Sequence, residues 1–306
     1  MQTKIQPAIF LLLASPVLAE LLSASSPATM FFQPIYFLLQ VVSYGIPALI
    51  IRELSVRWKL GLRGIFTMGL AYGIFNEGLL SHTFFQVSSL LAVGYGFHFG
   101  LALAWIPYIS IWHALHSILY PILLTYFIYP KVASEPWLGR RLFITFVTIV
   151  CLESFVLYFA PHRFPATLFV LFWFAIFLLF VLARRWPGII EKRPVTSHWA
   201  IVVTGFLSVL GSIAMIITAK AKVPLLIFWI ILFLLAYWVI RLLRKRGWLS
   251  MPALVLFACG DYILWAVFAG VITGSPVVIA TSLVFVLIFL KLVGMRSWFN
   301  GYVIQP

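Results

Sequence analysis

The sequence predicts an all-α fold: a polytopic transmembrane helical bundle of about ten spans, with both termini in the cytoplasm. Three observations predict it. Of the 306 residues, 64% are hydrophobic and only 9% are charged, whereas a soluble domain carries about 25% charged residues. The apolar residues form runs long enough to cross a bilayer. Lysines and arginines collect between alternate runs. A water-soluble domain of this size could not hide so much apolar surface, so that class is excluded.

Ten apolar runs approach the roughly 20 residues that a helix needs to cross the hydrocarbon core. The fourth run is longer, so we expect a tilted helix or an interfacial segment before Pro107. Because no repeat and no linker is visible, 1–306 is expected to form a single integral membrane domain. Its polar-site-bearing core covers about 6–160, and more apolar C-terminal helices cover about 165–306. The predicted spans are 6–24, 34–53, 64–81, 100–129, 142–160, 165–183, 199–219, 223–240, 249–272 and 276–294.

Positive charge alternates between the two sides of the predicted bundle. With the N-terminus inside, 18 of the 21 lysines and arginines fall in inside segments, and the three outside are Arg163, Lys220 and Lys222. This distribution follows the positive-inside rule, and a wrong number of spans would scramble it. The net charge of +14 is therefore spread over loops and forms no basic domain. We expect a lipid bilayer as partner, no nucleic acid, and a multi-pass location in the cytoplasmic membrane.

The first span has a second interpretation. Lys4 precedes an apolar stretch that ends in Val17-Leu18-Ala19, a pattern that is also typical of a signal peptide with a small-residue cleavage site. Cleavage would remove one span and leave the orientation of every later span unchanged. Both interpretations stay open at this point.

Ionisable residues inside a bilayer are costly, so each one is a functional candidate. His113, His116, Ser117 and Tyr120 share one helical face, because residues three or four apart lie together. Two histidines at this spacing, with Glu77 from the preceding span, could hold zinc and leave a position open for water. Alternatively, each histidine forms a hydrogen bond within a tightly packed bundle. The candidate catalytic and metal-binding residues are thus His113, His116 and Glu77.

Other polar groups at membrane depth are weaker candidates. Glu153 and Asp261 have no cation nearby in the sequence, so we expect them to be protonated or hydrogen-bonded. Glu53 and Arg57 have i, i+4 spacing at the inner end of the second span, which predicts an ion pair. The two cysteines fall inside predicted spans and form no CxxC motif. The complete set of these further candidates is Glu20, Asn76, Glu153, Asp261, Glu53 and Arg57.

Residues from about 10 to 140 resemble an uncharacterised family of polytopic membrane proteins from bacteria and archaea. The resemblance implies no established activity. It rests on the segments PVLAELLSASSP, YGIPALIIRELSVRWKLG, AYGIFNEGLLSHTFF, WHALHSILYPILL and PWLGRR.

A fainter likeness is to intramembrane proteases of the CAAX-protease and bacteriocin-processing type, which use the motifs EExxxR, FxxxH and HxxxN/D. The matches depart from each motif, so the likeness mainly implies a shared helical core. The first motif is alternatively matched by Glu53 and Arg57, which fit its ExxxR half. The degenerate matches are Asn76-Glu77 for EE with Ser81 in place of Arg, Trp112 to His116 for FxxxH, and His113 to Ser117 for HxxxN.

Three functions remain open from the sequence. The first is an intramembrane hydrolase in which Glu77 activates water and the histidines bind a metal or stabilise an oxyanion. Since Glu77 lies in the outer part of its span, we expect this site to open toward the outer face. The second is a proton-coupled transporter of five plus five spans, with His113 and His116 in one half and Asp261 in the other. The third is a non-catalytic scaffold or partner subunit.

Overall fold

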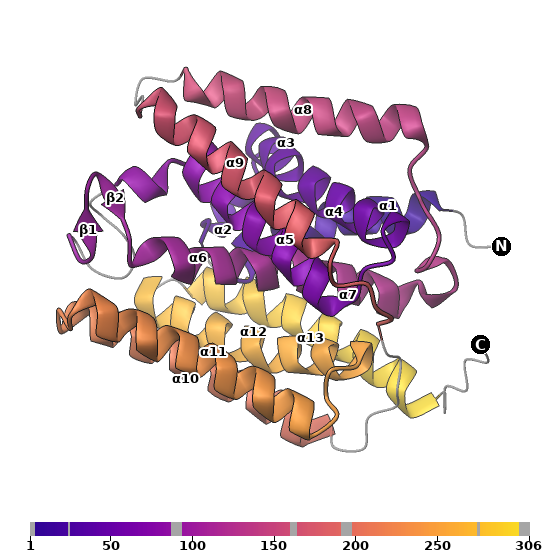
Figure 1. The fold of residues 1–306 in the computed structure, drawn as a ribbon. Helices are drawn as coiled ribbons and strands as arrows, with labels where there is room; N and C mark the ends of the chain where they lie inside the picture. Colours follow the sequence, from indigo (N-terminus) through magenta and orange to yellow (C-terminus); the bar gives the residue numbers. More distant parts are fainter. Residues whose placement is uncertain are drawn as a thin grey trace.

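The computed structural model describes residues 4–23, 25–86, 94–159, 164–190, 198–273 and 276–299. Within these ranges the chain is helical almost throughout (Figure 1). The α-helices are α1 (Ile5–Pro16), α2 (Ala28–Phe31), α3 (Pro34–Gln40), α4 (Ile46–Arg57), α5 (Leu62–Ile74), α6 (Trp105–His113), α7 (Tyr120–Ile128), α8 (Arg140–Tyr158), α9 (Ala166–Ala183), α10 (His198–Lys220), α11 (Leu225–Lys245), α12 (Met251–Thr273) and α13 (Pro276–Phe299).

Shorter elements extend or connect these helices. Short 3-10 helices cover Thr83–Phe85 and Pro130–Val132. Strands β1 (Phe97–His98) and β2 (Leu101–Ala102) form a small antiparallel hairpin. Four π-helical segments continue α1, join α3 to α4, continue α5 and join α6 to α7. They are Val17–Leu21, Val41–Gly45, Phe75–Leu80 and Ala114–Leu119.

Within the described ranges these elements make ten continuous helical rods, and each lies where the sequence predicts a span. Prolines help to set their starts, because a proline at the first turn loses no backbone hydrogen bond. Pro34 and Pro276 are first residues of α3 and α13, and Pro165 and Pro224 directly precede α9 and α11. The fourth rod begins at Trp105, because the residues before it form the hairpin and its turn. The predicted start at residue 100 is therefore too early.

Seven of the described helices are long and apolar enough to cross a membrane, and shorter apolar helices cover Ile5–Leu21 and Ile279–Lys291. The rod at 62–80 is not among the seven. An all-α polytopic bundle is thus confirmed, whereas the count of ten crossings and the cytoplasmic termini stay predictions. The seven are Pro34–Arg57, Trp105–Ile128, Arg140–Tyr158, Ala166–Ala183, His198–Lys220, Leu225–Lys245 and Met251–Phe268.

The helices pack as two groups. Helices α10 to α13 form a layer of their own in Figure 1, with α12 packed against both α10 and α13. Helix α9 packs against α5 and therefore belongs with the earlier helices. The two groups meet mainly where α12 contacts α7. This division into six rods and four does not match the five plus five that the transporter hypothesis expects.

Helices α10 and α12 approach each other very closely at two glycines. A Cβ atom on Gly205 would lie 1.9 Å from the carbonyl oxygen of Phe257, and one on Gly260 would lie 1.8 Å from that of Val202. Small residues are typical of such membrane-helix crossings, because they let the two backbones touch. The crossing fixes the position of α12, which carries Asp261.

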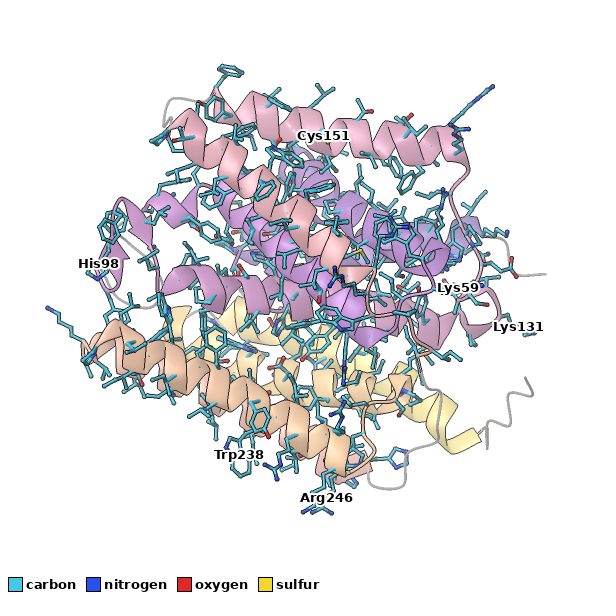
Figure 2. The ribbon with its side chains drawn as sticks, in the orientation of Figure 1. Lys59, His98, Lys131, Cys151, Trp238 and Arg246 are labelled. Carbon is cyan, nitrogen blue, oxygen red and sulfur yellow. The ribbon has the colours of Figure 1, made fainter. Side chains whose placement is uncertain are left out.

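Two lysines that the sequence predicts on the same side of the membrane, Lys59 and Lys131, lie at the same end of the bundle. His98 lies at one end and Lys59 and Lys131 lie at the other (Figure 2). The Lys4 ammonium is 3.1 Å from the Glu135 carboxylate, which places the start of α1 at the end that holds Lys131. This arrangement agrees with alternating spans.

At this end of the bundle, the buried side chain of Arg52 binds the segment that follows α7. Arg52 is fully buried, and its guanidinium lies 2.6 Å from the Glu53 carboxylate. It also donates to the carbonyls of Val132 and Ala133, and its Cζ atom is 3.2 Å from the centre of the Trp137 ring. The predicted partner of Glu53, Arg57, is more distant at 3.5 Å. The ion pair of the sequence analysis is therefore present, but Arg52 is its principal cation.

Candidate functional site

Several polar residues of the site lie on the π-helical segments, and His113 is the last residue of α6, directly before one of them. Glu20 lies in Val17–Leu21, Tyr44 in Val41–Gly45, Glu77 in Phe75–Leu80, and His116 with Ser117 in Ala114–Leu119. Such segments are rare and are often found at functional sites. Sequence reasoning missed them, because the extra residue in a π turn has no recognisable local signal. Their contacts define the candidate site.

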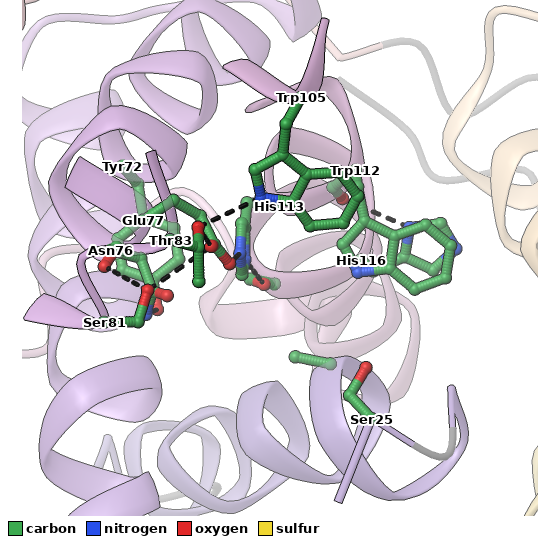
Figure 3. A network of polar contacts seen from close by, with 12 residues as sticks. Ser25, Tyr72, Asn76, Glu77, Ser81, Thr83, Trp105, Trp112, His113 and His116 are labelled. Carbon is green, nitrogen blue, oxygen red and sulfur yellow. Dashed lines mark hydrogen bonds and ion pairs between the residues drawn. The ribbon is translucent and has the colours of Figure 1, made fainter. Parts of the chain in front are cut away.

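A relay of three side chains forms the centre of the site (Figure 3). Glu77 Oε1 is 2.7 Å from His113 Nε2, and His113 Nδ1 is 2.8 Å from Ser117 Oγ. All three residues are buried, with 7%, 3% and 0% of their surfaces exposed. The structure thus brings Glu77 together with one of the two predicted histidines. The order of the groups is acid, imidazole, hydroxyl.

Glu77 is held by more than its histidine. Its second oxygen, Oε2, accepts hydrogen bonds from the hydroxyls of Thr83 and Ser81. The indole nitrogen of Trp105 donates to Thr83 Oγ1 at 3.0 Å. The segment that follows the third rod therefore folds back and fixes the carboxylate from the side of the hairpin. With both oxygens engaged, Glu77 is suited to orient an imidazole.

A second chain of hydrogen bonds runs from Asn76 toward α8. The Asn76 amide donates to the Tyr72 hydroxyl at 3.0 Å, and that hydroxyl donates to the Ser43 carbonyl at 2.8 Å. The Ser43 hydroxyl in turn donates to the Glu153 carboxylate. The sequence predicts a protonated or hydrogen-bonded Glu153, and Ser43 is its partner. The Tyr72 ring also packs edge-on against the His113 imidazole, with ring centres 5.6 Å apart.

Glu20 enters the same site from the first rod. The Tyr44 hydroxyl donates to Glu20 Oε1, and the Ser26 hydroxyl donates to Oε2 at 2.5 Å. The Tyr44 ring centre lies 5.9 Å from that of His113. Ser15 adds a further link, because its hydroxyl donates to the Ser117 carbonyl at 2.7 Å. Helix α1 is thus an integral part of the polar centre.

His116 belongs to a separate pair. Its Nε2 lies 2.9 Å from Asp261 Oδ2, and its ring stacks on Trp112 with centres 3.6 Å apart. The rings of Tyr120 and Tyr262 stand edge-on to it at 5.2 Å and 5.3 Å. Figure 3 shows His116 and Trp112 on the side of His113 away from Glu77. The pair joins the fourth rod to α12 across the boundary between the two helix groups.

The three residues of the predicted zinc set therefore divide between two pairs. A metal needs its nitrogen and oxygen ligands to converge within about 2.0–2.2 Å of one point. Among the residues that the structure describes, no group of three His, Cys, Asp or Glu side chains is arranged to hold a metal. The donor set does not fit zinc, because the second histidine faces a different carboxylate.

Comparison with known proteins extends the resemblance seen in the first half of the sequence. A search among curated proteins finds no match, and a search among solved structures finds none either. The likeness to intramembrane proteases gains no support from these comparisons. A family model described as an uncharacterized membrane protein family matches residues 9–304. Because this match covers almost the whole chain, the protein belongs to that membrane protein family.

Proposed function

We propose that this protein is an intramembrane hydrolase whose general base is His113. The observation that carries the proposal is the relay of Glu77, His113 and Ser117, with contacts of 2.7 Å and 2.8 Å. Its connectivity of acid, imidazole and hydroxyl is that of a serine hydrolase triad, which is recognised by geometry and roles on unrelated folds. Glu77 and Ser117 lie on π-helical segments, where functional groups are often found, and His113 directly precedes the second of these segments.

The hydrogen bonds assign a role to each group. An ionised carboxylate can only accept, so Nε2 of His113 carries the proton that faces Glu77. The lone pair on Nδ1 then faces the Ser117 hydroxyl. Glu77 orients the imidazole and stabilises its charged form, as the acid of a triad does. This differs from the sequence-based hypothesis, in which Glu77 itself activates water, because the Glu77 oxygens already accept three hydrogen bonds.

The reaction would proceed by acyl transfer. Ser117 Oγ adds to a carbonyl carbon as its proton passes to His113 Nδ1. His113 returns that proton to the leaving nitrogen or oxygen as the scissile bond breaks, which leaves an ester on Ser117. Water, deprotonated by the same nitrogen, then releases the acid and restores the hydroxyl. The substrate class is an amide or ester bond carried by a membrane-embedded molecule.

A fluorophosphonate probe tests this mechanism directly, because it reacts with an activated serine whatever the natural substrate. We expect labelling of the purified protein at Ser117, with no labelling of Ser117→Ala. Glu77→Gln should lower the labelling rate by at least about 100-fold, since the imidazole loses its ionic partner. Ser110→Ala is the matched control, because Ser110 is a buried serine on the same rod with no part in the relay. Labelling of Ser117→Ala at the wild-type rate would exclude Ser117 as the nucleophile.

A non-catalytic scaffold is the second candidate, and one observation favours it. Ser117 is fully buried, and Glu77 already accepts hydrogen bonds from Ser81 and Thr83. This arrangement also suits a polar network that holds neighbouring helices together. Under this function no variant of the relay changes probe labelling, and Ser117→Ala and Glu77→Gln lower only the thermal stability. The labelling and melting measurements on the same variants therefore separate the two functions.

A further inference from the structure

A cavity of about 470 Å³ lies at the arginine-rich end of the bundle, away from the relay. It is formed where the start of α5 and the segment after α9 meet the end of α11. Arg63 from the first turn of α5 and Arg244 from the last turn of α11 both line it. The cavity thus lies between the two helix groups, at the predicted cytoplasmic face.

One wall of this cavity is formed by two backbone segments that are hydrogen-bonded to each other. The Gly61 amide donates to the Trp186 carbonyl at 3.3 Å, and the Gly188 amide donates to the Lys59 carbonyl at 3.0 Å. A Cβ atom on Gly61 would lie 3.2 Å from Gly188 Cα, so the two backbone segments are in close contact here. The wall is therefore part of the fold and needs no ligand to form.

The charges that line the cavity have one sign. Arg63 and Arg244 are exposed cations, and none of the described lining residues is acidic. Guanidinium groups are well suited to phosphate, because their fork of donors matches two phosphate oxygens. The amides of the first turn of α5 add partial positive charge at the same place. The cavity therefore favours a phosphate-bearing anion.

The apolar part of the lining identifies the kind of anion. Ile189 is 91% exposed, and it lines the cavity together with Trp186 and Leu249. Free phosphate would gain nothing from these side chains, whereas a lipid presents acyl chains beside its phosphate. The adjoining helices α9 and α11 are largely uncovered by the rest of the protein, so a lipid can reach the cavity laterally. Anionic lipids are concentrated in the cytoplasmic leaflet.

We propose that this cavity binds the phosphate headgroup of an anionic phospholipid at the cytoplasmic face, with Arg63 and Arg244 as its cationic contacts. The site lies apart from the relay and is independent of the hydrolase function. Basic pockets between membrane helices on this side are suited to such headgroups. The lipid would bridge the six-rod and four-helix groups at a point where the structure leaves a gap.

Native mass spectrometry of the full chain in detergent tests the proposal with phosphatidylglycerol and phosphatidylcholine as probes. We expect phosphatidylglycerol to bind at least about tenfold more tightly than phosphatidylcholine. Each arginine is expected to contribute roughly fivefold, so Arg63→Gln with Arg244→Gln should weaken phosphatidylglycerol binding by about 25-fold. The matched control is Arg140→Gln, because Arg140 is an exposed arginine outside the cavity; it should leave binding unchanged.

Two results would overturn the proposal. Equal binding of the two lipids, or wild-type binding by the double variant, would show that the arginines do not select a lipid anion. Competition with inorganic phosphate distinguishes the source of the phosphate group. Displacement of phosphatidylglycerol by an equal concentration of inorganic phosphate would make the cavity a site for the free anion. Retention of the lipid under that challenge supports the lipid site.

Discussion

Substitution of Arg52 by glutamine should destabilise the protein more than substitution of any exposed arginine. Arg52 lies 2.6 Å from Glu53, which is itself fully buried, and donates to the Ala133 carbonyl at 2.8 Å. Its guanidinium also stacks 3.2 Å from the centre of the Trp137 ring. Removal of one partner from a buried ion pair costs about 3–5 kcal/mol, and Glu53 would stay buried with only the Trp137 amide and the more distant Arg57 as partners. We therefore expect Arg52→Gln to lower the free energy of unfolding by that amount.

Equilibrium unfolding of the purified protein in mixed micelles of dodecyl maltoside and sodium dodecyl sulfate measures this loss. Arg57→Gln is the matched control on the same helix, because Arg57 is 3.5 Å from Glu53 and its side chain is 32% exposed. It should cost no more than about 1 kcal/mol, as partly exposed ion pairs do. If Arg52→Gln lowered the free energy of unfolding by less than about 1 kcal/mol, or by no more than the control, Arg52 would not be the residue that stabilises the segment after α7.

The remaining predictions concern helix packing, the second acid–imidazole pair and topology. Gly260→Ala should lower the free energy of unfolding by about 2 kcal/mol or more, because its Cβ would lie 1.8 Å from a backbone oxygen of α10. Gly211→Ala, with 3.7 Å to a flexible side chain, should be neutral, and equal losses would contradict the steric argument. Asp261→Asn should cost about 2 kcal/mol in the same assay, since the buried carboxylate that lies 2.9 Å from His116 Nε2 is replaced by a neutral amide; an unchanged unfolding midpoint would contradict this. An impermeant maleimide should label Phe99→Cys in intact cells and spare Lys131→Cys, and the reverse pattern would invert the predicted topology.

The positions of the helices could be predicted from the sequence because hydropathy is a local property. Each apolar run must form its own backbone hydrogen bonds in a bilayer, so a run of sufficient length predicts a helix wherever it packs. All ten runs coincide with helical rods. The error at residue 100 has the same origin, since the small apolar hairpin before Trp105 has the composition of a span. Apolar composition alone does not distinguish the two.

The composition of the polar centre could be predicted only in part. Burial of His113, His116, Ser117 and Tyr120 follows from their spacing on one helical face, and all four are buried. The burial of Arg52 has no such signal, because an arginine at the end of a span normally reaches the interface. Besides the adjacent Glu53, its partners lie some 80 residues away in the chain, on the segment after α7.

The sequence by itself determined the class of protein, the place of each helix, the alternation of charge and the set of costly polar residues. Only the tertiary structure decided how those residues pair. His113 and His116 are three residues apart, yet one faces Glu77 and the other faces Asp261. The π-helical segment Ala114–Leu119 lies at this point in the rod, and the two histidines face different neighbouring helices. Which carboxylate each imidazole meets depends on which helices become neighbours, and that is set by close packing such as the glycine crossing of α10 and α12.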